Sequence, residues 1–294
     1  MFVDAIEKAA ALARSIHMIS CNYGSESIEA HAATLFFVNA DGWALTCAHV
    51  ERVFRSSGQI KAKYDAFKQE LAESGRQRRG NRIQRDPERK FEYSEGVQVE
   101  LHVRLMGCAT GPITVDIHPH PSADIALLKF NSFDRLLIDS FPVFPKDTRG
   151  LRQGLSLCRL GFPFPEFNNF TYDKKQDSTH WTETGRVASP RFPIDGMVTR
   201  QLLDSSGEMF GFEMSTLGLR GQSGGPAFDA EGKMWGMQSA TRHLNLDFDV
   251  DVEVLRKGIP QRVKENAFLH VGQCVHAEAL KSFMIKNKVE FQEE

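Results

Sequence analysis

The chain has 294 residues, of which 41% are hydrophobic and 25% are charged, and its formal net charge is −2. This is the composition of an ordinary globular protein, so it excludes a disordered chain, and the length allows one large domain or two half-domains. No apolar run approaches the ~18 residues that a membrane-spanning helix needs, and the net charge indicates no class of partner.

The N-terminal segment predicts a short amphipathic helix over about residues 3–14, followed by a strand. A secretion signal would begin with basic residues and continue as an uninterrupted apolar run, but this segment has Asp4 near its start and Arg14 within it. No secretion signal is therefore expected, and a cytoplasmic location is predicted.

The rest of the chain reads mostly as short strands separated by turns. Asp41 and Gly42 are a hairpin signal between two apolar runs in residues 32–46. Helices are expected in the charged stretch 59–90 and at 277–288. Many short strands without alternating long helices indicate a mostly β protein, an antiparallel barrel or sandwich. Further strands are predicted at 96–106, 112–118, 124–130, 154–162, 208–214 and 233–240.

The cysteines and histidines do not predict a metal site. The five cysteines are odd in number and widely spaced, and none forms a C-x-x-C pair. This pattern disfavours both a disulfide framework and a zinc site, so reduced thiols in a cytoplasm fit best. His118 and His120 are close in the sequence but lack a second cluster of His or Cys, which favours loop histidines over metal ligands.

The loop from Gly221 to Pro226 reads GQSGGP and surrounds Ser223 with residues that leave the backbone accessible. A serine hydroxyl is a weak nucleophile, so acyl transfer needs an imidazole base, a carboxylate that orients the imidazole, and donors for the developing oxyanion. His49, at the end of the predicted strand in WALTCAHV, is the imidazole candidate. Asp124, before the apolar strand of PSADIALLKF, is the carboxylate candidate, since the edge of a core would shield it partly from water.

The motifs TCAH, ADIALL and GQSGGP resemble those of the trypsin-like serine peptidases, and they follow that family's order of His, Asp and Ser. The resemblance covers about residues 30–50 and 95–285. It implies a chymotrypsin-like fold of two antiparallel six-stranded β-barrels. The catalytic triad His49, Asp124 and Ser223 would lie at their junction.

The same resemblance implies an oxyanion hole and a substrate pocket. The N–H groups of Gly221 and Ser223 would form the oxyanion hole. None of the pocket residues is acidic, so a small or medium apolar substrate side chain is favoured over Lys or Arg, while the nearby Arg220 and Arg242 leave an acidic preference open. The pocket would be lined by Leu217, Gly218, Ser239, Ala240 and Thr241. Ser239 also falls where the family often places a serine beside the catalytic Asp.

Gln222 distinguishes this chain from the secreted digestive members of the family. Those members have an Asp directly before the nucleophile, and it receives a new N-terminus after zymogen cleavage. Gln222 has no charge for such an ion pair, so activation by a freed N-terminus is not expected. The closer resemblance is to Deg/HtrA-like intracellular bacterial peptidases. No PDZ domain is expected, because the second barrel and a last helix need the residues after Ser223.

The chain is predicted to be a single trypsin-like peptidase domain over residues 1–294. The resemblance implies where each part of this domain lies in the sequence. The parts are a first barrel over about 15–130 with a charged insertion at 54–92, a second barrel over about 140–275, and a C-terminal helix at 276–288.

The insertion is strongly basic, with ten basic and five acidic residues between Lys61 and Lys90. A solvated helical insertion explains this charge most simply, and no interleaved aromatic residues support base stacking. Nucleic acid or an acidic protein would bind through its arginines, Arg76, Arg78, Arg79, Arg82 and Arg85.

The favoured function is a serine endopeptidase that cleaves protein substrates through an acyl-enzyme and requires no cofactor. An α/β-hydrolase is disfavoured although residues 221–225 match G-x-S-x-G, because Pro226 opposes the helix that must follow the serine. The remaining alternative is a latent or non-catalytic peptidase-fold module that binds or senses through the basic insertion. Such a module would be active only with a regulatory protein partner.

Overall fold

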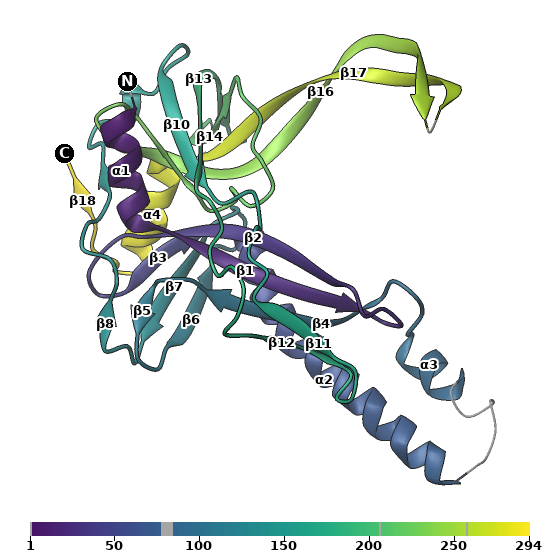
Figure 1. Ribbon diagram of the computed structural model, residues 1–294. Helices are drawn as coiled ribbons and strands as arrows, with labels where there is room; N and C mark the ends of the chain where they lie inside the picture. Colours follow the sequence, from purple (N-terminus) through teal and green to yellow (C-terminus); the bar gives the residue numbers. More distant parts are fainter. Residues whose placement is uncertain (1, 78–84, 206, 257) are drawn as a thin grey trace.

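Two six-stranded antiparallel sheets form the body of the molecule (Figure 1). The structure is a computed structural model that describes the chain except for residues 1, 78–84, 206 and 257. The first sheet consists, in spatial order, of β4 (Gln98–Leu105), β1 (Ala13–Asn22), β2 (Ile28–Phe37), β3 (Trp43–Thr46), β7 (Ala126–Asn131) and β6 (Thr114–Pro119). The second sheet closes into a barrel of β10 (Ser156–Gly161), β13 (Phe192–Leu203), β14 (Met209–Met214), β17 (Ile259–His276), β16 (Met234–Arg256) and β15 (Pro226–Phe228). The predicted mostly β, chymotrypsin-like fold is confirmed, but of the two predicted six-stranded barrels only the second is closed, because β4 and β6 at the edges of the first sheet do not pair with each other in the described chain.

The hairpin between β2 and β3 turns at the predicted Asp41 and Gly42. Gly42 has a φ of 86°, and a Cβ there would lie 2.9 Å from the carbonyl oxygen of Phe130. Glycine fits this left-handed turn without strain, whereas a side chain would clash with the neighbouring strand. The other predicted strand segments carry β4, β6, β7, β10, β14 and the start of β16.

Helices α1 (Val3–Leu12) and α4 (Ala277–Lys286) lie where helices are predicted. Helix α1 buries Ala5, Ala9 and Leu12 at the spacing of one helical face. Both helices contribute to the largest core cluster, which also contains residues of both sheets. The two ends of the chain therefore cover the same core as the strands.

Helix α2 (Ala48–Gln77) begins earlier than the sequence predicts. Helix is expected only from about residue 59, within the charged stretch, but one helix of 30 residues starts at Ala48, beside His49, and continues into that stretch as far as Gln77. It projects from the first sheet together with α3 (Arg85–Phe91), as Figure 1 shows. Buried aromatic side chains at Tyr64, Phe67 and Tyr93 hold its middle against the rest of the fold.

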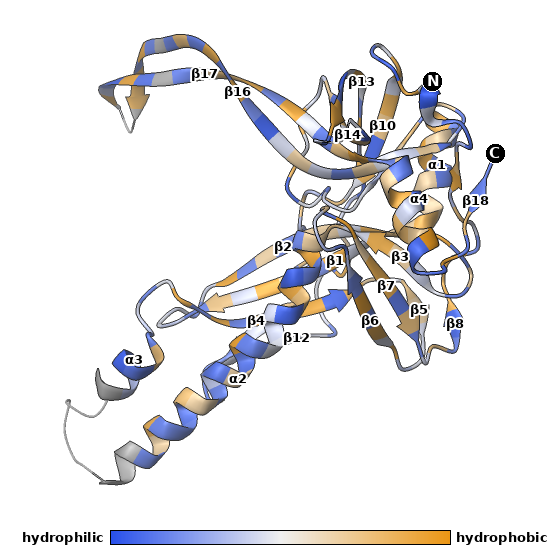
Figure 2. Cartoon of the chain, turned by 180° about the vertical axis from the view of Figure 1, so that it is seen from behind, coloured by the Kyte–Doolittle hydropathy of each residue, from blue (hydrophilic) through white to orange (hydrophobic). Residues whose placement is uncertain are grey.

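Strands β16 and β17 also exceed the prediction, because β16 continues from the predicted segment 233–240 to Arg256. The outer part of this hairpin, residues 242–256 and 259–271, extends away from the body of the molecule and is called the hairpin arm below (Figure 1). Hydrophilic and hydrophobic residues alternate along it (Figure 2).

Shorter elements lie outside the two sheets. A 3-10 turn, η1 (Thr148–Gly150), precedes the second barrel. None of the described helices is both long enough and apolar enough to cross a membrane. The short strand pairs are β5 (Ala109–Thr110) with β8 (Arg135–Leu136), β9 (Val143–Phe144) with β18 (Gln292–Glu293), and β11 (Phe170–Asp173) with β12 (Ser178–Trp181).

His276 caps α4 and must be neutral to do so. Its Nδ1 accepts a hydrogen bond from the N–H of Glu278 at 3.1 Å, which leaves no room for a proton on that atom. The ring is buried, and Nε2 has no hydrogen-bond partner among the described residues. Burial lowers the pKa of His276 to about 4.

Acid should therefore weaken the fold through His276. Unfolded histidine takes up a proton near its ordinary pKa of ~6.5, whereas the folded residue does so only near pH 4. The stability present above pH ~6.5 is lost as the pH falls toward 4. His276→Asn keeps a capping oxygen. Between about pH 6.5 and pH 4 its free energy of unfolding should therefore fall by about 2 to 3 kcal/mol less than that of the wild type.

Urea unfolding at a series of pH values measures the effect, with the exposed His31→Asn as the control. An unchanged pH dependence of the free energy of unfolding in His276→Asn would contradict the assignment.

Candidate functional site

The pairing of β3 with β7 brings His49 and Asp124 together. Thr46, the last residue of β3, lies opposite Ala126, the first residue of β7. The chain just beyond this pair carries His49 on one side and Asp124 on the other, so their approach follows from the strand register. The carboxylate of Asp124 accepts the backbone N–H of His49 at 2.9 Å, and its Oδ2 lies 2.8 Å from Nδ1 of the imidazole.

Asp124 has a further side-chain donor in Ser239, whose hydroxyl donates to Oδ2 at 2.6 Å. Burial opposes the charge, but the hydrogen bonds from His49 and Ser239 outweigh it and lower the pKa of the Asp124 carboxyl to about 2. The carboxylate also lies at the first turn of α2, where unpaired N–H groups favour an anion. Its charge therefore persists near neutral pH and holds a proton on Nδ1 of His49, which leaves Nε2 free to act as a base.

Thr34 of β2 holds the Ser223 loop against the first sheet. The Thr34 hydroxyl donates to the carbonyl oxygen of Gly221 at 2.7 Å, and its N–H donates to the carbonyl oxygen of Ser223 at 3.0 Å. Gly224 has a φ of 85°, and a Cβ on it would lie 2.1 Å from the carbonyl oxygen of Thr34. This close approach requires glycine, and it brings a loop of the second barrel onto the first sheet.

Ser239 links Ser223 to Asp124. The hydroxyl of Ser223 donates to the carbonyl oxygen of Ser239 at 3.3 Å, while the side chain of Ser239 contacts Asp124. His49, Asp124, Ser239 and Ser223 thus form one hydrogen-bonded chain. None of the hydrogen bonds found in the described part of the molecule joins Ser223 directly to His49, a contact that often tightens only when substrate is bound.

The N–H groups of Gly221 and Ser223 are available to a ligand. The turns of the loop use the N–H groups of Gln222, Gly224 and Gly225, which donate to backbone carbonyl oxygens at 2.8–3.0 Å. Within the described residues, the N–H groups of Gly221 and Ser223 have no such partner. Two free donors beside a hydroxyl group can stabilise an oxyanion that forms there.

Gln222 fixes the loop without a charge. Its side chain is fully buried. Its Oε1 accepts the N–H of Leu219 at 3.0 Å, and its Nε2 donates to the carbonyl oxygen of Phe192 at 3.1 Å. Both ends of the amide are satisfied, so the conformation of the loop needs no ion pair at this position.

The residues predicted to line the substrate pocket surround a space that is partly filled. The hydroxyl of Thr241 donates to the carbonyl oxygen of Gly218 at 2.6 Å and joins the two walls. Gln238 occupies the space below, because a Cβ on Gly218 would lie 2.3 Å from its Nε2. That Nε2 donates to the carbonyl oxygen of Ala240 at 2.7 Å, and Leu217 is exposed at the rim. Gln238 and the contact between Gly218 and Thr241 therefore take up part of the space that the predicted pocket would offer.

Arg159 of β10 contacts Gln238, and neither residue belongs to the motifs that the sequence singles out. The guanidinium is fully buried, and its Nη2 donates to the carbonyl oxygens of Thr216 and Leu217, both at 3.0 Å. Its Nη1 donates to Oε1 of Gln238 at 2.5 Å, and burial lowers the pKa of Arg159. A signal exists in the sequence, since an arginine within the apolar segment SLCRLGF is unusual for a buried strand.

Cys47 contributes to the site as a buried hydrogen-bond donor. Among the described residues, Cys47, His49 and Asp124 form one group whose possible ligand atoms lie within 4.8 Å of one another, a spacing that suits a metal. The thiol donates to the carbonyl oxygen of Gln238 at 3.3 Å. Burial and the nearby Asp124 raise the pKa of Cys47 well above its ordinary value. A metal ligand must be a thiolate, so these surroundings disfavour a metal.

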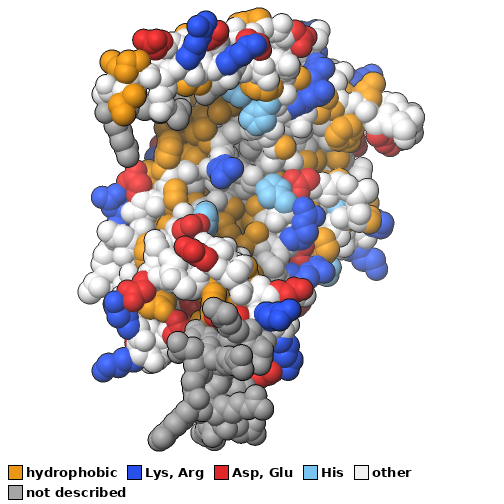
Figure 3. Space-filling view, turned by 90° about the vertical axis from the view of Figure 1, so that its right-hand side faces the viewer, with side chains coloured by type: hydrophobic (Ala, Val, Ile, Leu, Met, Phe, Trp, Pro, Cys, Tyr) orange, Lys and Arg blue, Asp and Glu red, His pale blue; other side chains and the backbone are white. Residues whose placement is uncertain are grey.

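A cavity of about 280 Å³ opens beside His49. His49 and Asp124 line it together with Arg52 of α2 and His120. Nδ1 of His120 accepts the N–H of Ala123 at 2.8 Å and so stabilises the loop that carries Asp124. Figure 3 shows a hollowed face between the two projections of the molecule, where hydrophobic and histidine side chains gather.

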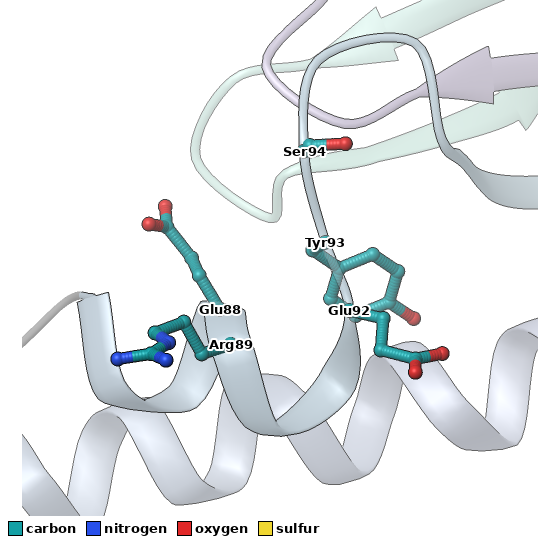
Figure 4. A pocket seen from close by; sticks show the side chains of 5 residues that line it. All are labelled: Glu88, Arg89, Glu92, Tyr93 and Ser94. Carbon is teal, nitrogen blue, oxygen red and sulfur yellow. The ribbon is translucent and has the colours of Figure 1, made fainter.

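The basic insertion contributes no described site. Arg78, Arg79 and Arg82 lie outside the described residues, while Arg76 belongs to α2 and Arg85 begins α3. A hollow of about 340 Å³ lies at the end of α3, and acidic side chains outnumber basic ones in its lining, which does not suit a phosphate (Figure 4). Nucleic-acid binding stays a prediction. The hollow is lined by Glu88, Arg89, Glu92, Tyr93 and Ser94.

One family profile and several solved structures match this chain. The profile, described as a trypsin-like peptidase domain, matches residues 33–237, which contain His49, Asp124 and Ser223. A search of curated proteins gave no significant match.

Structures of the HtrA-type protease AlgW are among those that match. The protease AlgW with a tripeptide is 15% identical with a TM-score of 0.48, and the alignment covers 98% of this chain and 65% of that one. A serine-to-alanine variant of AlgW with a tripeptide is 14% identical with a TM-score of 0.49, and the alignment covers 99% of this chain and 64% of that one. The chain therefore spans about two thirds of the length of the proteins it resembles.

The cysteines should be unreactive in the folded protein. All five are free and buried, and burial raises the pKa of Cys108, Cys158 and Cys274 to about 12. Ellman's reagent should therefore titrate almost no thiol in the native protein and all five in concentrated guanidinium chloride. Rapid modification of Cys47 in the native protein, identified by mass spectrometry, would contradict its placement beneath His49.

Proposed function

This chain belongs to the trypsin-like peptidase family, and on that premise we propose that it is a serine endopeptidase with Ser223 as its nucleophile. The observation that carries the proposal is the hydrogen-bonded chain that runs from His49 through Asp124 and Ser239 to Ser223. Its substrates would be proteins or peptides, as the family implies.

Each residue has one role in the proposed reaction. Nε2 of His49 accepts the proton of the Ser223 hydroxyl while Oγ attacks the scissile carbonyl, and it then gives the proton to the leaving amine. Asp124 holds the proton on Nδ1 and stabilises the imidazolium that forms. The N–H groups of Gly221 and Ser223 stabilise the oxyanion. Water, activated by the same imidazole, hydrolyses the acyl-enzyme, and no cofactor takes part.

In this proposal, the hydrogen bond between Ser223 and Ser239 is present only while no substrate is bound. Its length of 3.3 Å is greater than usual for a hydroxyl donor, so little is lost when the hydroxyl turns toward His49. The carbonyl oxygen of Ser239 then becomes free to accept an N–H of the substrate backbone. Substrate binding and alignment of the nucleophile would thus be coupled.

We also propose that the described parts form a single peptidase domain and that it works in the cytoplasm. The shared core of both sheets and the two terminal helices supports the first statement. Five free cysteines support a reducing compartment. A bacterial source and a regulatory partner stay predictions.

A fluorophosphonate probe should label the protein at Ser223. The probe forms a bond from Oγ to phosphorus and releases fluoride, so it needs both the nucleophile and its base. Labelling should be lost in Ser223→Ala and fall at least about 100-fold in His49→Ala. Ser239→Ala should label about tenfold more slowly, because Asp124 loses a charged hydrogen bond.

In-gel fluorescence measures the labelling rate. The control is Ser27→Ala, at an exposed serine that is distant from Ser223 in the sequence. Labelling that persists in Ser223→Ala, or a folded wild-type protein that does not label with or without protein substrate, would refute the proposal.

The partly filled pocket supports a preference for small side chains directly before the scissile bond. Fluorogenic peptides with Ala or Val at that position should be cleaved faster than those with Phe, Lys or Glu. Thr241→Ala removes the hydroxyl that joins the pocket walls and should raise kcat/KM for Leu relative to Ala by about tenfold.

Thr171→Ala, an exposed threonine of β11, is the control and should leave the ratio of kcat/KM for Leu to that for Ala unchanged. A wild-type preference for Lys, Phe or Glu would contradict this reading of the pocket.

A further inference from the structure

Strand β16 loses one of its two partners at the candidate active site. β15 pairs with it only from Met234 to Met237, and the backbone of Gln238 still bonds to Gly224 and Gly225 of the nucleophile loop. Beyond Gln238, the described residues form no strand pair on this side, although β17 continues to pair with β16 on the other side. The free edge of β16 therefore begins beside Ser223.

The backbone geometry shows which groups this free edge presents. Thr241 lies opposite Gly272 of β17, and the N–H of Gly272 donates to the carbonyl oxygen of Thr216, away from β16. In an antiparallel ladder, the two residues of a non-hydrogen-bonded pair both direct their backbone N–H and C=O groups away from each other's strand. Thr241 and the alternate residues His243 and Asn245 thus direct their backbone groups to the free edge.

The edge continues well beyond the predicted pocket. The register between β16 and β17 is uninterrupted from Ala240 to Asn245, and it then shifts before Asp249. At Asp247 the backbone has a φ of 58°, which marks the irregularity. The stretch from Ser239 to Asn245 can accept about 20 Å of extended chain, and the hairpin arm continues past it.

The direction of an added strand follows from β15. A strand that continues the line of β15 and pairs antiparallel with β16 has its C-terminal end at Ser239 and its N-terminal end at the hairpin arm. The substrate residue beside Ser223 is then the one whose carbonyl is attacked. The substrate residues upstream of it extend outward along the arm.

Exposed apolar side chains cover the arm just past this edge. Leu246 and Phe248 on β16 are 44% and 57% exposed, and Phe268 and Leu269 on β17 are also exposed. Two ion pairs lie nearby within the arm, because Lys264 pairs with Asp249 at 2.6 Å and Arg262 pairs with Asp251 at 2.8 Å. The arm therefore offers a partner an apolar surface beside charges that are partly paired within the arm.

A long unpaired edge with apolar side chains is normally avoided, because it recruits other strands. The edge from Ser239 to Asn245 carries no proline or lysine that would block pairing, and its Arg242 lies 3.6 Å from the buried Glu213.

We propose that one part of the hairpin arm, Arg242 to Phe248, binds an extended apolar segment of the substrate polypeptide by strand addition. The bound segment lies upstream of the scissile bond. This inference rests on the proposed function. The backbone groups of His243 and Asn245 bind the main chain, and Leu246 and Phe248 contact apolar side chains. The occupant is an unfolded segment of the substrate, because a chain that pairs with this edge and also reaches Ser223 must be extended and free of other backbone pairing on that side.

The test uses matched peptides that share the residues around the scissile bond. A long peptide adds about six upstream residues of alternating valine and threonine, and a third peptide replaces alternate residues of that extension by proline, which removes the N–H donors. The long peptide should be cleaved with a kcat/KM about tenfold above that of the short one, through a lower KM. The proline peptide should lose this gain.

The double variant Leu246→Ser and Phe248→Ser should cleave the short peptide at the wild-type rate and lose the gain for the long peptide. Leu255→Ser, at an exposed leucine near the tip of the arm, is the matched control and should retain the gain. Equal kcat/KM for all three peptides would overturn the proposal.

A binding measurement separates this inference from the proposed function. Fluorescence anisotropy of the labelled long peptide with Ser223→Ala should show binding that weakens about tenfold in the Leu246→Ser and Phe248→Ser background, whether or not the wild type cleaves it. Binding unaffected by these changes would overturn the proposal. So would sedimentation that shows dimers lost in the double variant, since the arm would then pair with a second copy of the chain.

Discussion

The carboxylate of Asp124 is the interaction on which the site depends. It is a charge held where the first sheet meets the second barrel, and a partly buried charge is tolerated only when several donors satisfy it. His49 donates to it from the start of α2, and Ser239 donates from β16. One anion therefore ties together the sheet, the helix and the barrel, and a shift of any of them would leave a costly unpaired group.

The neutral amide of Gln222 holds the loop that carries Ser223 in place. Its two hydrogen bonds lie entirely within the second barrel and its adjoining loops, so they form as that barrel folds. Thr34 adds the contacts that seat the loop on the first sheet. The Ser223 loop is thus held by hydrogen bonds of uncharged groups within the folded chain, which is consistent with the absence of an acidic residue at position 222.

The sequence predicts the fold class and the main candidates for the site, because the relevant signals are local. His49, Asp124 and Ser223 each lie in a short motif at the end of a strand or in a glycine-rich loop. The roles of Thr34 and Gln238 could not be predicted, since they arise only when separate strands come together in two sheets, and Arg159 gives only the signal of a charged residue within an apolar strand. The long β16 is an intermediate case: its apolar residues alternate with polar ones from 244 to 254, the period of a strand, but the pattern does not show that the strand leaves the barrel. Gly58 within α2 similarly conceals that the helix is continuous, because glycine usually disfavours a helix interior.

The unbroken length of α2 gives the molecule a mechanical property. His49 occupies the first turn of a helix of 30 residues, which is about 45 Å long. Such a helix behaves as a rod, and Tyr64 and Phe67 hold its middle against the rest of the fold. A displacement of its distal end therefore tilts the rod about that contact, and the tilt changes the angle at which His49, at the other end, faces Asp124.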